Sequence, residues 1–191
     1  SHEAQLVGVR DLTHDMREMF TVDPGTYTVT EIQNPLYELF SIECNDTDST
    51  GNVATSTATY VVGKEEVTEC VFTNREKPTI TIIKRLNIDR LSANFTFINN
   101  GDGSQFILLQ NESRTFRGAT STAAFSFTED LTISPLDMNF EYKLNAIVCT
   151  NADNATIVIN GNSTAGTISV VLGPGVHAVC EFFNNGSECL L

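Results

Sequence analysis

The stretch Thr26-Tyr27-Thr28-Val29-Thr30-Glu31 alternates threonine with large apolar residues and ends on a carboxylate. The same pattern returns as Ala124-Phe125-Ser126-Phe127-Thr128-Glu129. A period of two indicates a strand, and β-branched and aromatic residues favour strands. Similar short runs, separated by turns rich in Asn and Gly, follow one another along most of the chain. They predict an all-β protein of the sandwich type.

A longer internal repeat extends outward from this stretch. Residues 41–74 match residues 146–184. Each copy has a strand that ends in cysteine, an acidic loop rich in Asn and Thr, an alternating strand, a turn with glycine, and a strand that contains a second cysteine. Two tandem copies of one supersecondary unit explain this pattern better than one domain does. We therefore predict two small β-sandwich domains, residues 1–76 and residues 77–191.

The two copies differ at their beginnings. Residues 5–9 align with residues 105–109, but the runs over residues 79–84 and 93–98 have no counterpart in the first copy. We expect the first sandwich to lack one or two strands, which leaves backbone groups unpaired and the core open. Three explanations stay open: the sequence is excised from a longer array, residues 1–22 close the sheet, or a neighbouring chain supplies the strand.

Charge and hydropathy exclude several classes of function. The 191 residues include 24 acidic and 11 basic side chains, so the formal net charge is −13. An acidic protein with few cations is unsuited to binding nucleic acid, because that binding depends on neutralising phosphates. No apolar run approaches the roughly 20 residues that a membrane-spanning helix needs. We expect neither nucleic-acid binding nor a membrane-spanning segment.

Five cysteines provide the next signal. The repeat pairs Cys44 with Cys70 and Cys149 with Cys180, one disulfide in each copy, and leaves Cys189 without a partner. Disulfides of this kind are typical of secreted or cell-surface proteins, which fold in oxidising compartments. The three histidines are scattered and no CxxC motif occurs, so the cysteines do not indicate a metal site. Cys189 is either a free thiol or an intermolecular link.

Asparagine followed at the second position by Ser or Thr marks candidate N-glycosylation sites. Six such positions occur, and none has proline in the middle. In a secreted protein they predict covalent glycans on the surface; the alternative is that Asn and Thr are simply common in a protein of strands and turns. The candidate positions are Asn45, Asn94, Asn111, Asn154, Asn162 and Asn185.

Residues 24–31, 41–44 and 70–74 together resemble the prealbumin-like (Cna-B-type) repeats of secreted microbial surface proteins and pili. Residues 78–84 resemble the opening strand of the next repeat in such arrays. The resemblance extends over residues 20–190 and is looser in the second copy, where the Pro-Gly-Thr turn has become Ser121-Thr122-Ala123. It implies prealbumin-like or Ig-like sandwiches that serve as stalks, adhesin spacers or pilus subunits.

Members of this family often carry an isopeptide bond between a first-strand lysine and a last-strand Asn or Asp, assisted by a glutamate. The resemblance places Lys84, Glu129 and Asn184 at these positions in the second copy. Burial would favour the neutral, nucleophilic amine of the lysine. The first copy has Glu31 and Asn74 but no lysine strand. The alternative is that Lys84 and Glu129 face water and form no bond.

The sequence contains no motif typical of hydrolases, phosphate-binding loops or dinucleotide-binding domains. Asp46-Thr47-Asp48-Ser49-Thr50-Gly51 has acidic residues at alternate positions, as calcium loops do, but the twelfth position is Thr57, where a bidentate ligand is needed. We interpret it as an acidic, solvated turn. We therefore expect no catalytic residues, no metal site and no cofactor.

These observations predict a non-enzymatic subunit of an extracellular surface fibre. Copies of the chain would assemble head to tail by β-strand addition, with residues near either terminus, such as the arm of residues 1–10, as the donor. The alternative is an adhesin or carbohydrate-binding module, or a passive stalk repeat, excised from a larger surface protein. Its ligand would bind the loops near residues 45–52, 99–104 and 151–163.

Overall fold

The structure is a computed structural model that describes residues 15–88, 93–130, 140–151 and 160–188. The chain divides into two compact units, residues 1–75 (unit 1) and residues 76–191 (unit 2). The described residues form strands and no helix, which confirms the all-β prediction. Among them, accordingly, no helix is long and apolar enough to cross a membrane.

Unit 1 contains two small sheets. One sheet has the order β1-β4-β3, built from β1 (Gly25–Thr30), β4 (Thr57–Val62) and β3 (Thr50–Asn52). The other pairs β2 (Tyr37–Cys44) with β5 (Cys70–Glu76). The alternating stretch that opens the repeat is therefore β1, which runs antiparallel to β4 with Tyr27 opposite Tyr60.

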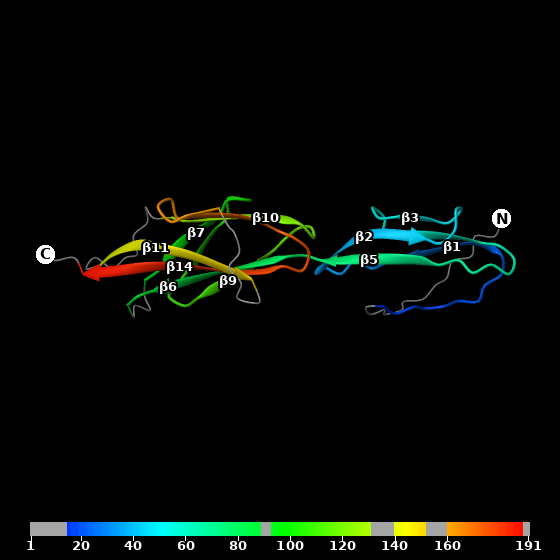
Figure 1. The fold of residues 1–191 in the computed structure, drawn as a ribbon, viewed down its shortest axis with the longest axis horizontal. Helices are drawn as coiled ribbons and strands as arrows, with labels where there is room; N and C mark the ends of the chain where they lie inside the picture. The colour runs from blue at the N-terminus through cyan, green and yellow to red at the C-terminus, as the bar shows by residue number, and fades with distance from the viewer. Residues whose placement is uncertain (1–14, 89–92, 131–139, 152–159, 189–191) are drawn as a thin grey trace. The chain divides into compact units, whose positions relative to one another are not determined.

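Unit 2 contains two larger sheets. The five-stranded sheet has the order β12-β13-β10-β7-β8 and the four-stranded sheet the order β11-β14-β6-β9. Figure 1 shows β14 between β11 and β6. The strands are β6 (Thr79–Leu86), β7 (Phe95–Asn99), β8 (Gln105–Leu108), β9 (Ser113–Arg117), β10 (Ala123–Glu129), β11 (Phe140–Asn151), β12 (Asn160–Asn162), β13 (Thr167–Leu172) and β14 (His177–Glu188).

Strand order shows which parts of the two units correspond. By the sequence repeat, β1 to β5 correspond to β10, β11, β12, β13 and β14. Residues 15–75 contain no counterpart of β6, β7 or β9, and the region aligned with β8, residues 5–9, lies outside the described residues. The described part of unit 1 is therefore the less complete of the two sandwiches, as the sequence predicts.

The cores differ accordingly. Unit 2 has a continuous apolar core between its sheets, with Ile80, Phe97, Ile168 and Phe182 fully buried. In the described part of unit 1 the buried hydrophobic side chains are Tyr27, Leu39 and Ala58. Large apolar side chains on the same unit remain exposed. They include Ile32, Leu36, Tyr37, Phe40, Val67 and Val71.

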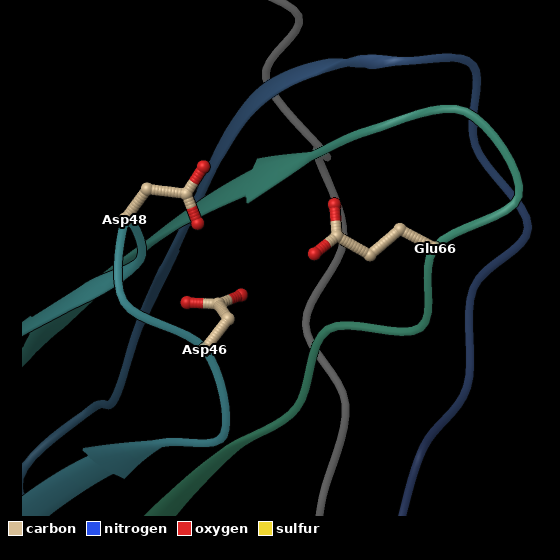
Figure 2. A group of neighbouring side chains, drawn as sticks. All are labelled: Asp46, Asp48 and Glu66. Carbon is tan, nitrogen blue, oxygen red and sulfur yellow. The ribbon is translucent and has the colours of Figure 1, made fainter.

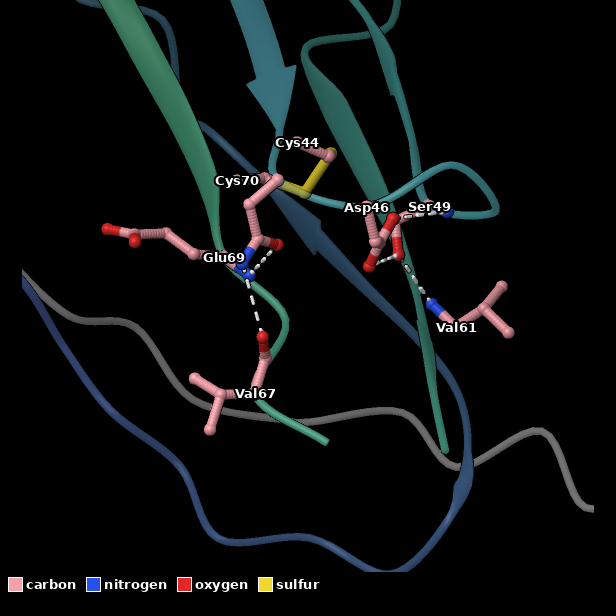
Figure 3. Close-up of a disulfide and its surroundings, with 8 residues drawn as sticks. Cys44, Asp46, Ser49, Val61, Val67, Glu69 and Cys70 are labelled. Carbon is pink, nitrogen blue, oxygen red and sulfur yellow. Dashed lines mark hydrogen bonds between the residues drawn. A yellow bond between two sulfur atoms is a disulfide. The ribbon is translucent and has the colours of Figure 1, made fainter. Parts of the chain in front are cut away.

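Each unit contains one disulfide. Cys44 and Cys70 join β2 to β5 (Figure 3), and Cys149 and Cys180 are direct cross-strand partners on β11 and β14. These are the pairs that the repeat predicts. Cys189 lies outside the described residues.

Candidate functional site: a buried Lys-Glu-Asn triad

The triad of unit 2 follows from strand alternation. On β6, Ile80, Ile82 and Lys84 are buried at every second position, so the lysine occupies the third place of an apolar, inward-facing series. Glu129 ends the buried series of Phe125 and Phe127 on β10. The same periodicity that builds the core therefore directs these two polar side chains into it.

Asn184 reaches the same place from β14. It follows Ala178, Cys180 and Phe182, which are all buried and separated by two positions. Because β14 runs parallel to β6, with Phe182 opposite Lys84, the asparagine and the lysine come from neighbouring strands of one sheet. Glu129 comes from the facing sheet. The core thus contains one cation, one carboxylate and one carboxamide where the three inward-facing series meet.

Lys84 and Asn184 both form hydrogen bonds with the carboxylate of Glu129. Lys84 Nζ lies 3.0 Å from Glu129 Oε1 and 3.1 Å from Oε2, and Asn184 Nδ2 donates to Glu129 Oε1 over 2.6 Å. Lys84 is 0% exposed and Glu129 2%. The alternative in which Lys84 and Glu129 face water is therefore wrong.

An aromatic ring packs against the lysine. Lys84 Nζ lies 4.1 Å from the centre of the Phe95 ring, and Phe95 contacts Tyr142 edge-on at 5.5 Å. Such rings exclude water while their faces attract a cation. The sequence analysis did not select Phe95. Its signal was present in the alternating residues 95–99, where Phe95 and Phe97 share the inward face.

Burial changes the protonation of the triad. It lowers the pKa of Lys84 to about 8, although the charge and hydrogen bonds of Glu129 oppose the change. Burial also raises the pKa of Glu129, while Lys84 and Asn184 favour its charged form. Both shifts favour the neutral groups, because desolvation penalises charge. A neutral amine beside a protonated carboxyl group is the combination that amide chemistry requires.

The asparagine carbonyl has a particular position in this arrangement. Asn184 Oδ1 is buried without a hydrogen-bond partner. The charged carboxylate of Glu129 accepts a hydrogen bond from Nδ2 of Asn184. A protonated Glu129 can instead donate a hydrogen bond to Oδ1, if the carboxamide is flipped by 180° so that Oδ1 and Nδ2 exchange places. Donation to Oδ1 would polarise the Cγ carbonyl and provide its buried oxygen with a partner.

The acidic loop of unit 1 has a different arrangement. Figure 2 shows the side chains of Asp46, Asp48 and Glu66 grouped together. One carboxylate oxygen from each lies within 4.8 Å of the other two. Two of them stabilise turns: Asp46 accepts bonds from the backbone N and the hydroxyl of Ser49, and Glu66 accepts one from the Gly63 backbone N. Ser49 Oγ accepts a bond from the Val61 backbone N, which ties the loop to β4 (Figure 3). Sequence reasoning did not find Glu66 in this group.

The candidate glycosylation sites differ in accessibility. Asn94 is half-buried, and Asn154 lies outside the described residues. The side chain of Asn45 bonds the backbone at both Val67 and Glu69, so a glycan there would compete with a turn that borders the disulfide. The exposed candidates are Asn45, Asn111, Asn162 and Asn185.

No protein-family model and no curated protein matches the chain. The similar solved structures are bacterial surface proteins. One is an adhesin from Mobiluncus mulieris that contains intramolecular disulfide, isopeptide and ester cross-links; it is 14% identical over 63% of this chain, with a TM-score of 0.41. This chain spans 45% of the adhesin chain.

Another similar structure is a major pilin of Streptococcus pyogenes, which is 16% identical to this chain, with a TM-score of 0.40. The alignment covers 88% of this chain and 70% of the pilin chain. A second structure of a major pilin from that organism is 16% identical over 85% of this chain, with a TM-score of 0.33. Likenesses at this level carry no argument about function.

Proposed function

We propose that this chain is a non-enzymatic structural subunit of an extracellular surface fibre, and that unit 2 is locked by an isopeptide bond between Lys84 and Asn184. The observation that carries the proposal is the buried triad, in which Lys84 and Asn184 lie on adjacent parallel strands and both contact Glu129. A cross-link of this kind serves mechanical strength, which a fibre subunit needs.

The reaction balances without any cofactor. The lone pair of the neutral Lys84 Nζ attacks Cγ of Asn184, and a C–N bond forms. Glu129, protonated at the start, donates its proton to Nδ2 and takes in its place the proton that the amine loses, so the Cγ–Nδ2 bond breaks, ammonia leaves and the carboxyl group is restored. The dry, aromatic surroundings favour the neutral amine and exclude competing water.

The position of the bond suits a protein under tension. The chain enters unit 2 through β6 and leaves it through β14, and these strands are direct neighbours. A covalent link between Lys84 and Asn184 joins the entry and exit strands. Tension then passes through the link, and the residues between the two positions stay folded. The disulfides support the same conclusion, since they indicate an oxidising, extracellular setting.

The mass of the intact protein tests the bond. We expect a mass lower by one ammonia than that of the disulfide-bonded sequence, and fragments that join residue 84 to residue 184. Asn184→Ala and Lys84→Met should each restore the uncorrected mass. Asn185→Ala and Lys143→Met are matched controls at exposed positions and should keep the ammonia loss. An unmodified mass for the folded wild-type protein would contradict the proposal.

Assembly is the second part of the proposal. Copies of the chain would polymerise head to tail, with a strand from one molecule completing the open unit 1 of the next. Within residues 15–88, β5 pairs with β2 alone; this edge and the exposed apolar side chains of unit 1 support the proposal. Electron microscopy of native secreted material should show thin fibres with a repeat of two small domains. Isolated two-lobed particles would favour a spacer or an adhesin fragment instead.

A further inference from the structure

Unit 1 contains equivalents of two of the three triad residues, Glu31 for Glu129 and Asn74 for Asn184. Asn74 Nδ2 on β5 donates to Glu31 Oε1 over 2.9 Å, as Asn184 Nδ2 does to Glu129 Oε1. Glu31 directly follows β1, at the position that Glu129 holds on β10. The pair therefore comes from the same two strands in each unit, one strand from each sheet.

The backbone around the two glutamates also corresponds. The Glu31 backbone N donates to Ser56 O over 2.8 Å, and the Glu129 backbone N donates to Gly166 O over 2.9 Å. Ser56 and Gly166 both have a positive φ. The preceding threonines make matching hydroxyl contacts across the strand pair, Thr30 with Thr57 and Thr128 with Thr167. Glu31 is thus held in the place and direction of Glu129.

One atom distinguishes the two pairs. Glu129 Oε2 lies 3.1 Å from Lys84 Nζ, whereas Glu31 Oε2 is buried and has no hydrogen-bond partner among the residues that the structure describes. A buried carboxylate oxygen without a partner costs free energy, and a cation is the group that best satisfies it. The group missing from Glu31 is the one that Lys84 provides in unit 2.

The edge of β5 also indicates that a lysine-bearing strand is the missing partner. In unit 2, β14 pairs with β11 on one side and with the lysine strand β6 on the other. Among the described residues, β5 pairs with β2 alone. Its outer edge corresponds to the side of β14 that β6 occupies. Asn74 is exposed there, whereas Asn184, on the strand beside β6, is 2% exposed.

We propose that unit 1 is an acceptor for a lysine-bearing β-strand, which runs parallel to β5 along its edge away from β2 and forms an isopeptide bond with Asn74. The inference deepens the strand-addition assembly proposed above and rests on it. It identifies the incoming strand by its chemistry: apolar residues at alternate positions, with a lysine in the inward-facing series as on β6.

This chain has no suitable lysine of its own. Its four lysines are Lys64, Lys77, Lys84 and Lys143. Lys84 is fully buried in unit 2, Lys64 is in an exposed turn, Lys77 precedes β6, and Lys143 is exposed on β11. Residues 1–14 contain none, so a strand from that segment would dock without the bond. Unit 1 itself therefore supplies no lysine that could join Glu31 and Asn74.

The reaction is that of unit 2. The neutral amine of the incoming lysine attacks Cγ of Asn74, the Cγ–Nδ2 bond breaks, and ammonia leaves. Glu31 takes the proton from the amine and delivers it to Nδ2. Docking of the strand supplies the dry surroundings, because it covers Asn74 and the apolar side chains beside it.

A synthetic peptide tests the acceptor. The probe has the sequence of residues 78–87, which includes β6, and is incubated with the full oxidised chain. We expect an adduct equal to the two masses less one ammonia, with the link at Asn74. Asn74→Ala should abolish the adduct and Glu31→Gln should slow it by tenfold or more. Asn184→Ala should keep it, because the second unit is not the acceptor.

A peptide with methionine in place of its lysine separates the inference from the assembly proposal. It should bind reversibly, as measured by fluorescence anisotropy, because strand pairing does not require the amine. Reversible binding of both peptides with no covalent adduct would overturn the lysine inference and leave strand addition standing. No binding of either peptide would overturn both. An adduct that persists in Asn74→Ala would also overturn the inference.

Discussion

Units 1 and 2 share a Glu–Asn hydrogen bond but differ in what covers it. In unit 2 the pair lies in a core between two sheets, with β6 paired beside β14, and Asn184 is 2% exposed. In unit 1 the corresponding Asn74 is exposed and β5 has a single neighbour in the described residues. Two strands therefore determine the geometry of the pair. The third strand supplies the nucleophile and the dry environment that give the pair its chemistry.

Removal of Lys84 should change the difference in stability between the two units more than any other substitution considered below. In the chain-entropy account, a cross-link that closes a loop of about 100 residues stabilises by about 4–5 kcal/mol. Lys84→Met should lose that stabilisation in unit 2 and leave unit 1 unchanged. Stepwise urea unfolding measures both units. An unchanged midpoint for unit 2 would mean that no cross-link is present.

The second prediction uses equivalent phenylalanines. Phe182 is 0% exposed in unit 2, while Phe72 at the matching position of β5 is half-buried. Phe182→Ala should cost about 3–5 kcal/mol, and Phe72→Ala about half of that or less, because less contact is lost. The free energies of unfolding of the two variants test this. Equal costs would indicate that unit 1 is already covered in solution.

The disulfides should rank next. Each closes a loop of similar length, with sequence separations of 26 and 31 residues, so each should stabilise by about 3–4 kcal/mol. The consequence should differ, because unit 1 has few buried apolar side chains to offset the loss. We expect Cys44→Ala/Cys70→Ala to unfold unit 1, and Cys149→Ala/Cys180→Ala to leave unit 2 folded but weaker. Protease sensitivity of each unit, read by mass spectrometry, distinguishes these results.

A pH dependence is the smallest expected effect. In Asn184→Ala, which cannot form the bond, Lys84 titrates in the folded state near its lowered pKa of about 8 and in the unfolded state near its ordinary value of 10.5. Between these values the unfolded state binds more protons, so the stability of unit 2 should rise with pH across that window. Asn184→Ala/Lys84→Met is the control and should lack the rise.

Strand alternation and the internal repeat were sufficient to predict much of this protein. They indicated the all-β class, the runs that became β1, β10 and β13, and the cysteine pairs that the structure joins. The family resemblance selected Lys84, Glu129 and Asn184, which the structure brings into contact. Alternation with a period of two indicates which residues share a face of a strand. The internal repeat indicates which strands of the two units correspond.

Other features required the tertiary structure. Whether the Lys84 face of β6 is buried depends on β14 and the facing sheet, which lie far along the chain. The aromatic contact with Phe95 and the carboxylate group with Glu66 likewise join residues that no local pattern connects. Such contacts depend on strand pairing over long sequence separations.

The sequence by itself determined which residues alternate, which segments repeat and which cysteines correspond, because these are properties of local order along the chain. The tertiary structure alone decided that Lys84 is enclosed with Glu129, and that Glu31 Oε2 is buried without a partner in the described part of the chain. The physical reason is that burial belongs to an assembly of strands. The same alternating strand is dry or wet according to the neighbour that pairs with it.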